Sequence, residues 1–409
     1  MNTRMDRARL NIGAYFLAPY ARDERHVREV AECGIDFIVC MDPDRPALDR
    51  MHRYGIGAIV TQVLPGWWGG DGDNAGKMEE TNPISGYEAA AAAFEDHPAI
   101  WGIDAGDEPS ALDFPYYGRV MDLVERSFPH QFAYLNLYPN YASVAVNTAN
   151  ETVNQLGTAT YAEHIDQYCQ HVGTDYICYD FYMYSASVEG AYENLRIVSE
   201  ACLRTGRSMW IVLQVNSSRE AEWITENQLR FQAYSALAFG AENIIWGCYT
   251  AGWWYNQVLD ENGEKTQQYD KLKAVNAELH TLGGAYMGYR RVSTHFVGFQ
   301  GDPVMDKVRQ APVSALNTGI FSGLREEKGG SLLVGQMVSR AGDGSYALMV
   351  CNAADPLDTA ASTAYVRFKA DGRQIRIITG AGEITPQRQA DGSYRFPLPS
   401  CVGALVIAR

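Results

Sequence analysis

Acidic residues cluster at the end of a short apolar run, in the segment AIWGIDAGDEPS. Asp107 and Glu108 are adjacent there, and Asp104 precedes them. A further acid, Asp180, lies inside the aromatic run TDYICYDFYMY. A carboxylic acid among apolar neighbours keeps its proton near neutral pH, and a second carboxylate can then attack a substrate or activate water. We therefore expect Glu108 to be a general acid and Asp180 its catalytic partner.

Aromatic residues follow other apolar runs, as in LPGWWGGDGDNAG and WGCYTAGWWYN. Aromatic rings stack on the C–H faces of sugars, while polar side chains bind the hydroxyl groups. Two carboxyl groups among aromatic rings suit cleavage of a glycosidic bond, which needs a proton donor and a nucleophile or base. The expected substrate contacts are Asp107, Gln214, Trp67, Trp68, Tyr138, Tyr182, Trp246, Tyr249, Trp253 and Trp254.

Eight apolar runs carry these side chains and alternate with amphipathic stretches. Helix caps are readable between them: Asp23 precedes one helical pattern, and Thr225 with Gln228 forms a T-x-x-Q capping box before another. Eight β-then-α units in about 270 residues predict a (β/α)8 TIM barrel. A doubly wound sheet would also alternate, but the first run lacks a G-x-G-x-x-G turn. The runs are residues 10–20, 35–42, 56–65, 99–104, 131–140, 174–184, 208–215 and 241–249.

The barrel also explains why residues far apart in sequence can form one site. Catalytic groups of a TIM barrel come from the carboxyl ends of the strands and the loops after them. Asp104 ends the fourth run, Asp107 and Glu108 follow it within four residues, and Asp180 lies in the sixth run. We expect these carboxyl groups to meet at one end of the barrel.

The pattern changes after about residue 290, where short strands alternate with turns such as AGDGS, ADGR and ADGS. Strands of this length separated by strong turn signals are typical of an antiparallel β-sandwich. We therefore predict two domains, a catalytic α/β barrel over residues 1–285 and a β-sandwich over residues 286–409.

The barrel region, residues 10–282, resembles clan A glycoside hydrolases, the superfamily that includes families 5 and 42. The motif that carries the resemblance is GDEP after the fourth strand. In that clan a Glu at this place, usually after Asn, is the acid/base residue. The resemblance implies that Glu108 is the acid/base and that Asp107 takes the place of the Asn. The barrel followed by a sandwich is also similar to these enzymes.

The sequence departs from the clan at the seventh strand, MWIVLQVNSS. The clan places its nucleophilic Glu at the end of this strand, whereas Gln214 stands here, and an amide cannot attack as a carboxylate does. Three interpretations stay open. The enzyme is inverting, with Asp180 or Asp42 as base; or Glu220 or Glu226 folds back from the seventh loop; or the pocket binds sugar without hydrolysis.

Several of these residues also have purely structural interpretations. Asp180 inside an apolar strand requires hydrogen-bond partners whether or not it is catalytic. Glu226 follows a capping residue and favours the helix dipole. One Trp of each pair can anchor its loop, and Asn136 and Asn140 suit either hydroxyl binding or a turn.

The composition restricts the partners. A net charge of -15 argues against nucleic acid and anionic membranes, which bind excess Lys and Arg. No apolar run is long enough for a membrane span, and the amino terminus does not read as a signal peptide. The eight scattered cysteines fit buried thiols in a reducing compartment. We expect a cytoplasmic protein with a small carbohydrate substrate, no cofactor and no metal, and leave a homo-oligomer open.

Two other functions are compatible with the sequence. One is a barrel that binds carbohydrate without turnover, because the clan's nucleophile is missing. The other is a metal-dependent isomerase or lyase that uses Asp42, Asp104 and Asp180, although no His joins these carboxylates in a local motif.

Overall fold

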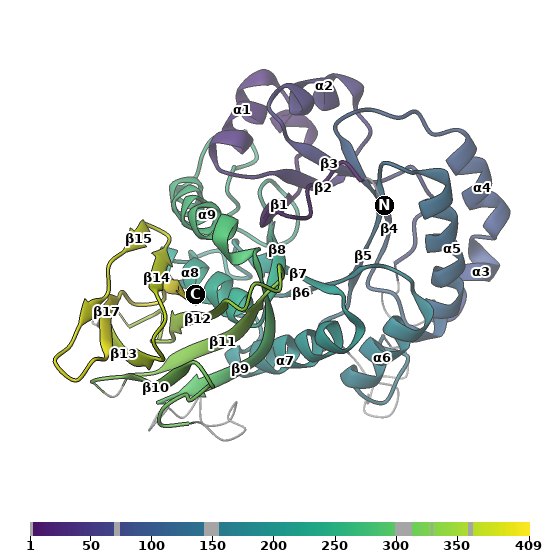
Figure 1. Cartoon of the computed structure of the whole chain (residues 1–409). Coiled ribbons are helices and arrows are strands. Elements are labelled where there is room, and N and C mark those ends of the chain that lie inside the picture. Colours follow the sequence, from purple (N-terminus) through teal and green to yellow (C-terminus); the bar gives the residue numbers. More distant parts are fainter. Residues whose placement is uncertain (1–2, 69–73, 143–154, 299–312, 329, 359–362) are drawn as a thin grey trace.

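The computed structural model describes residues 3–68, 74–142, 155–298, 313–328, 330–358 and 363–409. Its first part is a closed barrel in which neighbouring strands are parallel and β1 pairs with β8 (Figure 1). This confirms the predicted (β/α)8 architecture. The strands are β1 (Asn11–Tyr15), β2 (Phe37–Met41), β3 (Gly57–Val60), β4 (Ile100–Asp107), β5 (Phe132–Leu137), β6 (Tyr176–Phe181), β7 (Ser208–Gln214) and β8 (Ala241–Gly247).

Helices surround the barrel, and local signals in the sequence start several of them. The Asp23 side chain accepts a hydrogen bond from the backbone N–H of His26, and Thr225 and Gln228 form the expected capping box. The helices are α1 (Glu24–Glu32), α2 (Arg45–Arg53), α3 (Met78–Thr81), α4 (Ile84–Ala92), α5 (Phe114–Ser127), α6 (Tyr161–His171), α7 (Val188–Thr205), α8 (Glu226–Ala238) and α9 (Gln267–Tyr286), with 3-10 turns η1 (Pro19–Ala21) and η2 (Ala111–Asp113).

Side chains fill the interior of the barrel toward its amino-terminal end. Phe132 and Tyr176 pack around Trp210, and the Arg7 guanidinium lies 4.8 Å from the centre of the Trp210 ring. Tyr134, Cys178 and Val212 belong to the same buried cluster. The interior is therefore a packed core rather than a pore, which leaves the carboxyl ends of the strands as the place for a site.

The second part consists of two antiparallel sheets, which confirms the expected β-sandwich. One has the order β15-β14-β18-β12-β11-β9 and the other β10-β13-β17-β16. A hydrophobic core that includes Val334, Val366 and Phe396 lies between them. The strands are β9 (Tyr289–Val297), β10 (Phe321–Glu326), β11 (Leu332–Ser339), β12 (Tyr346–Asn352), β13 (Ala364–Ala370), β14 (Ile375–Thr379), β15 (Gly382–Ile384), β16 (Gln387–Arg388), β17 (Tyr394–Leu398) and β18 (Gly403–Ala408).

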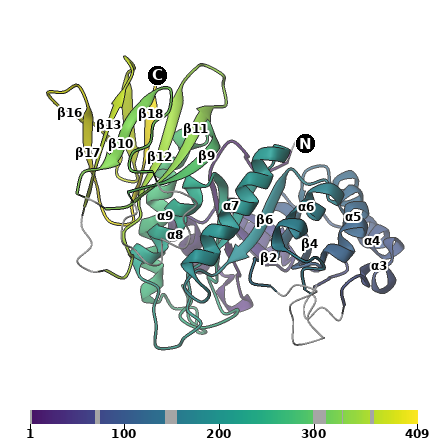
Figure 2. The same ribbon diagram turned by 90° about the horizontal axis from the view of Figure 1, so that it is seen from below.

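The six-stranded sheet packs against α8 and α9 of the barrel (Figures 1 and 2). Leu333, Met349 and Leu405 of this sheet belong to the same hydrophobic cluster as the outer layer of the barrel. The approach is close, since a Cβ on Gly335 would lie 2.3 Å from the carbonyl oxygen of Ala238. The sheet therefore holds α8 from the side opposite the barrel.

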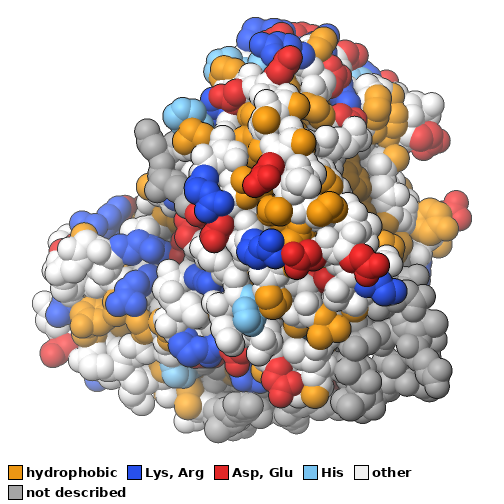
Figure 3. All heavy atoms as spheres, turned by 90° about the vertical axis from the view of Figure 1, so that its right-hand side faces the viewer, with side chains coloured by type: hydrophobic (Ala, Val, Ile, Leu, Met, Phe, Trp, Pro, Cys, Tyr) orange, Lys and Arg blue, Asp and Glu red, His pale blue; other side chains and the backbone are white. Residues whose placement is uncertain are grey.

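The outer surface carries side chains of both charges (Figure 3). Acidic and basic side chains are interspersed over the face that carries α3, α4 and α5 (Figure 3). Among the described helices, none combines the length and the apolar character that crossing a membrane requires.

Candidate active site

Four carboxyl groups gather at the carboxyl ends of β4 and β6. Three come from the single segment Asp104, Asp107 and Glu108, and the fourth is Asp180. Asp180 is only 4% exposed, whereas Asp107 is open to solvent in the mouth of the barrel. The structure thus brings the predicted general acid and its predicted partner to the same end of the barrel.

An irregularity in β4 turns two of these carboxyl groups to the same side. Asp104 pairs with Tyr134, but after a register shift Asp107 pairs with Asn136. Without the shift, residues three apart in a strand would face opposite sides. Gly106 lies within it at φ 149, and a Cβ there would lie 2.2 Å from the Tyr117 hydroxyl oxygen. The ladder continues through the shift, which is why β4 extends to Asp107, beyond the predicted run.

Glu108 occupies an unusual backbone position directly after β4. Its φ of 44° lies in the left-handed region, which costs a residue with a Cβ about 1 kcal/mol or more. Its backbone N–H donates to the carbonyl of Asn136 at 2.9 Å, and its Oε2 accepts a hydrogen bond of 3.2 Å from Nε1 of Trp68. Both contacts fix the carboxyl group at the mouth, with Trp68 itself 55% exposed.

Asn136 of β5 joins two of the carboxyl groups. Its Nδ2 donates to Oδ1 of Asp107 at 3.1 Å and to Oδ1 of Asp180 at 2.8 Å. Asn136 is buried, so these two hydrogen bonds satisfy an amide that has no access to bulk water. This residue is absent from the expected substrate contacts, although its place near the end of the fifth run was a signal for it.

Burial and mutual repulsion keep protons on the carboxyl cluster. Burial, together with the charges of Asp180 and Asp107, raises the pKa of Glu108 to about 9. Burial and the Asp107 charge raise the pKa of Asp104 and of Asp180 to about 7 each. Although Asp107 reaches solvent, the protein that surrounds it in the barrel mouth limits its hydration and raises its pKa to about 6, against the hydrogen bond from Asn136. At neutral pH, Glu108 is therefore a protonated acid beside carboxyl groups that ionise more easily.

Tyrosine and cysteine side chains form the floor below the carboxyl groups. The hydroxyl groups of Tyr15 and Tyr134 lie 2.7 Å apart, and Sγ of Cys40 donates to Oδ2 of Asp104 at 3.4 Å. The Tyr134 hydroxyl also lies 3.5 Å from Sγ of Cys178. These groups separate the carboxyl cluster from the apolar layers beneath it.

One side of the mouth is an aromatic wall formed by Tyr182, Trp253 and Trp254. The Tyr182 ring lies 5.6 Å from that of Trp253 and 5.0 Å from that of Trp254. Trp253 also packs edge-on against Phe16 at 5.4 Å. The three members of the wall come from the segments after β6 and β8, and all three are partly exposed. Trp68 lies after β3, on another part of the rim.

Four other predicted contacts are in the packing rather than at the mouth. Trp67 is buried, so it anchors the loop from which Trp68 projects. Tyr138 is 1% exposed and its ring contacts His164. Trp246 is buried and donates through Nε1 to Oδ1 of Asn276 on α9, and Tyr249 is also buried. Aromatic character indicated these residues, but the structure does not bring them to the open end of the barrel.

Gln214 ends β7 and uses its whole side-chain amide within the protein. Its Oε1 accepts from the backbone N–H of Tyr184 at 2.9 Å. Its Nε2 donates to Oγ of Ser185 at 2.9 Å and to the carbonyl of Asn216 at 3.0 Å. Gln214 therefore ties the segments after β6 and β7 together.

Two of the other three acids considered from the sequence form ion pairs with arginines. Asp42 pairs with Arg22 at 2.8 Å and accepts from Nε2 of Gln62 at 2.8 Å. Glu226 pairs with Arg230 on α8 at 2.5 Å, and Glu220 is exposed. Within the described parts of the chain, no group of three or more His, Cys, Asp and Glu side chains has a geometry that could hold a metal ion.

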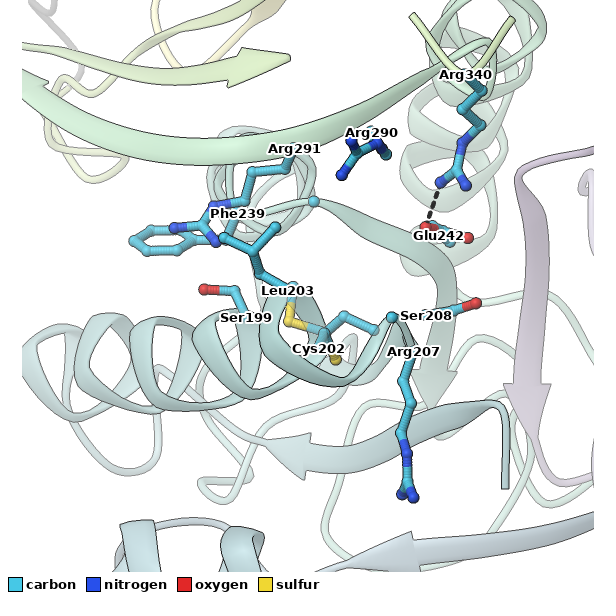
Figure 4. A pocket seen from close by; sticks show the side chains of 13 residues that line it. Ser199, Cys202, Leu203, Arg207, Ser208, Phe239, Glu242, Arg290, Arg291 and Arg340 are labelled. Atoms are coloured by element: carbon cyan, nitrogen blue, oxygen red, sulfur yellow. Dashed lines mark hydrogen bonds and ion pairs between the residues drawn. The ribbon is translucent and has the colours of Figure 1, made fainter. Parts of the chain in front are cut away.

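A hollow of about 120 Å³ lies at the opposite, amino-terminal end of the barrel, where β7 and β8 begin (Figure 4). Arg290, Arg291 and Arg340 line it, and Arg340 pairs with Glu242. Its lining contains none of the four carboxyl groups, so it is separate from the site at the mouth.

No protein-family model matches this chain, and no curated protein sequence does. Among solved structures, it is similar to a cycloisomaltooligosaccharide glucanotransferase from Paenibacillus sp. complexed with cycloisomaltoheptaose, at 8% identity and a TM-score of 0.53 over 98% of this chain and 85% of that one. A glucosidase from Croceicoccus marinus matches at 10% identity and a TM-score of 0.43 over 100% and 98%. A family 5 mannosidase from Rhizomucor miehei matches at 11% identity and a TM-score of 0.44 over 68% and 94%. Because the glucanotransferase is only 8% identical to this chain, the similarity between the two establishes a shared fold and nothing more.

Proposed function

We propose that this chain is a glycoside hydrolase that cleaves an O-glycosidic bond in a neutral oligosaccharide or glycoside, with Glu108 as general acid. The observation that carries the proposal is the state of Glu108. It lies at the barrel mouth beside an exposed Trp, and burial raises its pKa to about 9. A protonated carboxyl group at neutral pH is what protonation of a leaving oxygen requires.

Asp180 is the second carboxyl group of the proposed reaction. After burial, its charge is the largest influence that raises the pKa of Glu108, which supports pairing the two groups. Asn136 donates to Asp180 and favours its ionised form. The alternatives are less suitable, because Asp42 pairs with Arg22, Glu226 pairs with Arg230, and Glu220 is exposed. We therefore propose an inverting reaction in which Asp180 is the base that activates water.

The walls of the mouth support a sugar substrate. Trp68 and the aromatic wall offer ring faces, and Asp107 is an exposed hydrogen-bond acceptor. The three carboxyl groups that ionise near neutral pH, Asp104, Asp107 and Asp180, disfavour an anionic sugar, because its charge would meet like charges. The solved glucanotransferase of the same fold is complexed with cycloisomaltoheptaose. This supports carbohydrate as the substrate class.

One observation favours a second function, carbohydrate binding without turnover. The strand that carries the nucleophile in the clan A enzymes ends here in Gln214, whose amide is occupied by hydrogen bonds within the protein. The two functions differ in product release, which is directly measurable.

Time-resolved anomeric NMR tests the proposal. The protein and its Glu108→Gln variant would be incubated with α- and β-linked glucosides, galactosides, mannosides and arabinosides. We expect product of inverted configuration from the wild-type protein and none from the variant. Product of retained configuration would contradict Asp180 as base. Binding of a sugar by calorimetry with no product would support the binding function instead.

We also propose that the protein acts in the cytoplasm. All eight cysteines are free thiols in the structure, and six of them are buried. Free, buried thiols suit a reducing compartment. Fractionation of cells that make the protein, with a cytoplasmic and a secreted marker, would locate it.

A further inference from the structure

The end of β7 is held by a side chain from α8. Oε1 of Gln232 accepts from the backbone N–H of Gln214 at 3.0 Å, and Nε2 of Gln232 donates to the Gln214 carbonyl at 2.6 Å. Both residues are 1% exposed. The two bonds satisfy both backbone groups of Gln214 through one amide, so the place of β7 depends on the place of α8.

The C-terminal sheet fixes α8 from its other side. Sγ of Cys351 on β12 lies 3.1 Å from the carbonyl of Tyr234, and β11 approaches Ala238 at Gly335 without room for a Cβ. Figures 1 and 2 show α8 between the barrel and this sheet. Gln232 therefore projects from a helix that is packed on both sides.

The side chain of Gln214 extends this support toward the mouth. The backbone N–H of Tyr184 needs an acceptor, and Oγ of Ser185 and the carbonyl of Asn216 each need a donor. A side-chain amide supplies one acceptor oxygen and two N–H donors at once. A carboxylate at this position would lose both donors and add a buried charge. The contacts explain the presence of Gln at the end of β7 without a role in bond cleavage.

The partners of Gln214 are next to the aromatic wall. Tyr184 follows Tyr182 by two residues in the segment after β6. On the other side, Nδ2 of Asn216 donates to the carbonyl of Trp253 at 2.6 Å. One amide thus connects to the segments that present Tyr182 and Trp253, whose rings contact each other.

We infer that Gln214 is a positioning residue, which sets the aromatic wall of the sugar site through Ser185 and Asn216 instead of binding the substrate itself. The inference rests on the proposed function, because it assigns the wall to sugar binding. Either Gln214→Ala or Ser185→Ala removes the hydrogen bond between these two side chains. Once Gln214 is replaced, replacing Ser185 as well should therefore have no further effect on substrate binding.

A double-mutant cycle tests this coupling. Gln214→Ala, Ser185→Ala and the double variant would be compared for KM and kcat on a glycoside that the wild-type protein hydrolyses. We expect KM to rise about 10-fold in Gln214→Ala and about 3-fold in Ser185→Ala, with kcat changed by less than about 3-fold. The double variant should be no worse than Gln214→Ala, because the pair shares one interaction. If the increase of KM in the double variant equalled the product of the increases in the two single variants, the inference would be wrong.

Ser218→Ala is the matched control. Ser185 donates to Oγ of Ser218 at 2.9 Å, so this variant removes a neighbouring hydroxyl group and leaves the Gln214 contact intact. KM should stay at the wild-type value. An equal rise of KM in Ser218→Ala and Ser185→Ala would overturn the specific role of Gln214.

A spectroscopic measurement separates this inference from the proposed function. Near-ultraviolet circular dichroism reports the packing of Tyr182, Trp253 and Trp254 without any substrate. We expect a spectral change in Gln214→Ala, a smaller change of the same kind in Ser185→Ala, and none in Ser218→Ala. Ser185 is exposed, so its variant keeps the test valid if Gln214→Ala does not fold. An unchanged spectrum in Ser185→Ala overturns the inference, whereas a wild-type protein that hydrolyses no glycoside contradicts the proposed function alone.

Discussion

Asp104 and Asp107 face the same side of β4 although they are three positions apart, because the ladder shifts register between Asp104 and Gly106. The shift adds a carboxyl group to the mouth that a regular strand would direct outward. It also places Asp107 opposite Asn136, which connects it to Asp180. The raised pKa values of Asp104 and Asp180, to which the Asp107 charge contributes, therefore depend on this one irregularity in β4.

The pH dependence of kcat/KM should be bell-shaped and shifted toward alkaline pH. Activity needs Asp180 ionised and Glu108 protonated, so it should rise near pH 7 and fall near pH 9, from their pKa values of about 7 and about 9. The two limbs belong to the carboxyl cluster as a whole. Initial rates at low substrate concentration over pH 4–10 measure the profile. A fall of activity that is complete by pH 6 would contradict the assignment of Glu108.

Replacing Asn136 should alter the acidic limb of that profile. Asn136→Ala removes the hydrogen bond that lowers the pKa of Asp180, so the acidic limb should move to higher pH and kcat should fall about 10- to 100-fold. Asn140→Ala is the control, because Nδ2 of Asn140 donates to the Gly190 carbonyl outside the carboxyl cluster. Equal losses in the two variants, with both limbs unmoved, would argue that Asn136 is only structural.

Two substitutions of Trp68 should separate its hydrogen bond from its ring. Trp68→Phe keeps an aromatic face but loses the N–H that lowers the pKa of Glu108, so the alkaline limb should move upward with little change in KM. Trp68→Ala also loses the ring face, and KM should rise about 10-fold, the equivalent of one stacking contact. If Trp68→Ala binds substrate as tightly as wild type, the ring is not a sugar platform.

Asp104→Asn should stabilise the protein at alkaline pH. Burial raises the folded-state pKa of Asp104 from its ordinary value of 3.8 to about 7. Below pH 4 the carboxyl group is protonated in the folded and the unfolded protein, so it does not reduce the free energy of unfolding. As pH rises from 4 through 7, ionisation favours the unfolded protein and that free energy falls. The gain from Asn should be roughly 1–3 kcal/mol larger at pH 8 than at pH 4. Urea unfolding of both proteins at the two pH values measures this difference.

Asp343→Asn is the control, because the pKa of Asp343 is lowered rather than raised. Hydrogen bonds from Ser345 lower the pKa of Asp343 to about 2, so this carboxyl group stays ionised at pH 4 and at pH 8. Its replacement should therefore change the free energy of unfolding by the same amount at both values. If Asp104→Asn behaved in the same way, Asp104 would not be a group that holds a proton at neutral pH.

The fold could be predicted because eight apolar runs, their helix caps and the turn-rich C-terminal region each have a local signature. Glu108, Asp180 and Asp107 could be placed at one end because strand ends meet there. The direction in which individual side chains point was harder to predict from the sequence. In β8 the inward residue Ile245 and the outward residue Trp246 are neighbours, and aromatic character does not show which one faces the barrel.

Contacts between distant segments were outside the reach of the sequence. The register shift near Gly106 depends on the pairing with β5, and the bridge through Asn136 depends on three strands. The occupation of the Gln214 amide depends on α8 and on the segment after β6. None of these contacts has a local pattern, because each joins residues that are 18 to 44 positions apart.

The most direct test of Glu108 as general acid compares leaving groups. Wild type and Glu108→Gln would be assayed on one glycosyl group carrying either an alkyl leaving group, which needs a proton to depart, or 2,4-dinitrophenolate, which does not. Glu108→Gln should lower kcat/KM by about 10³-fold or more on the alkyl glycoside and by less than about 10-fold on the dinitrophenyl glycoside. Equal losses on both substrates would contradict proton donation by Glu108.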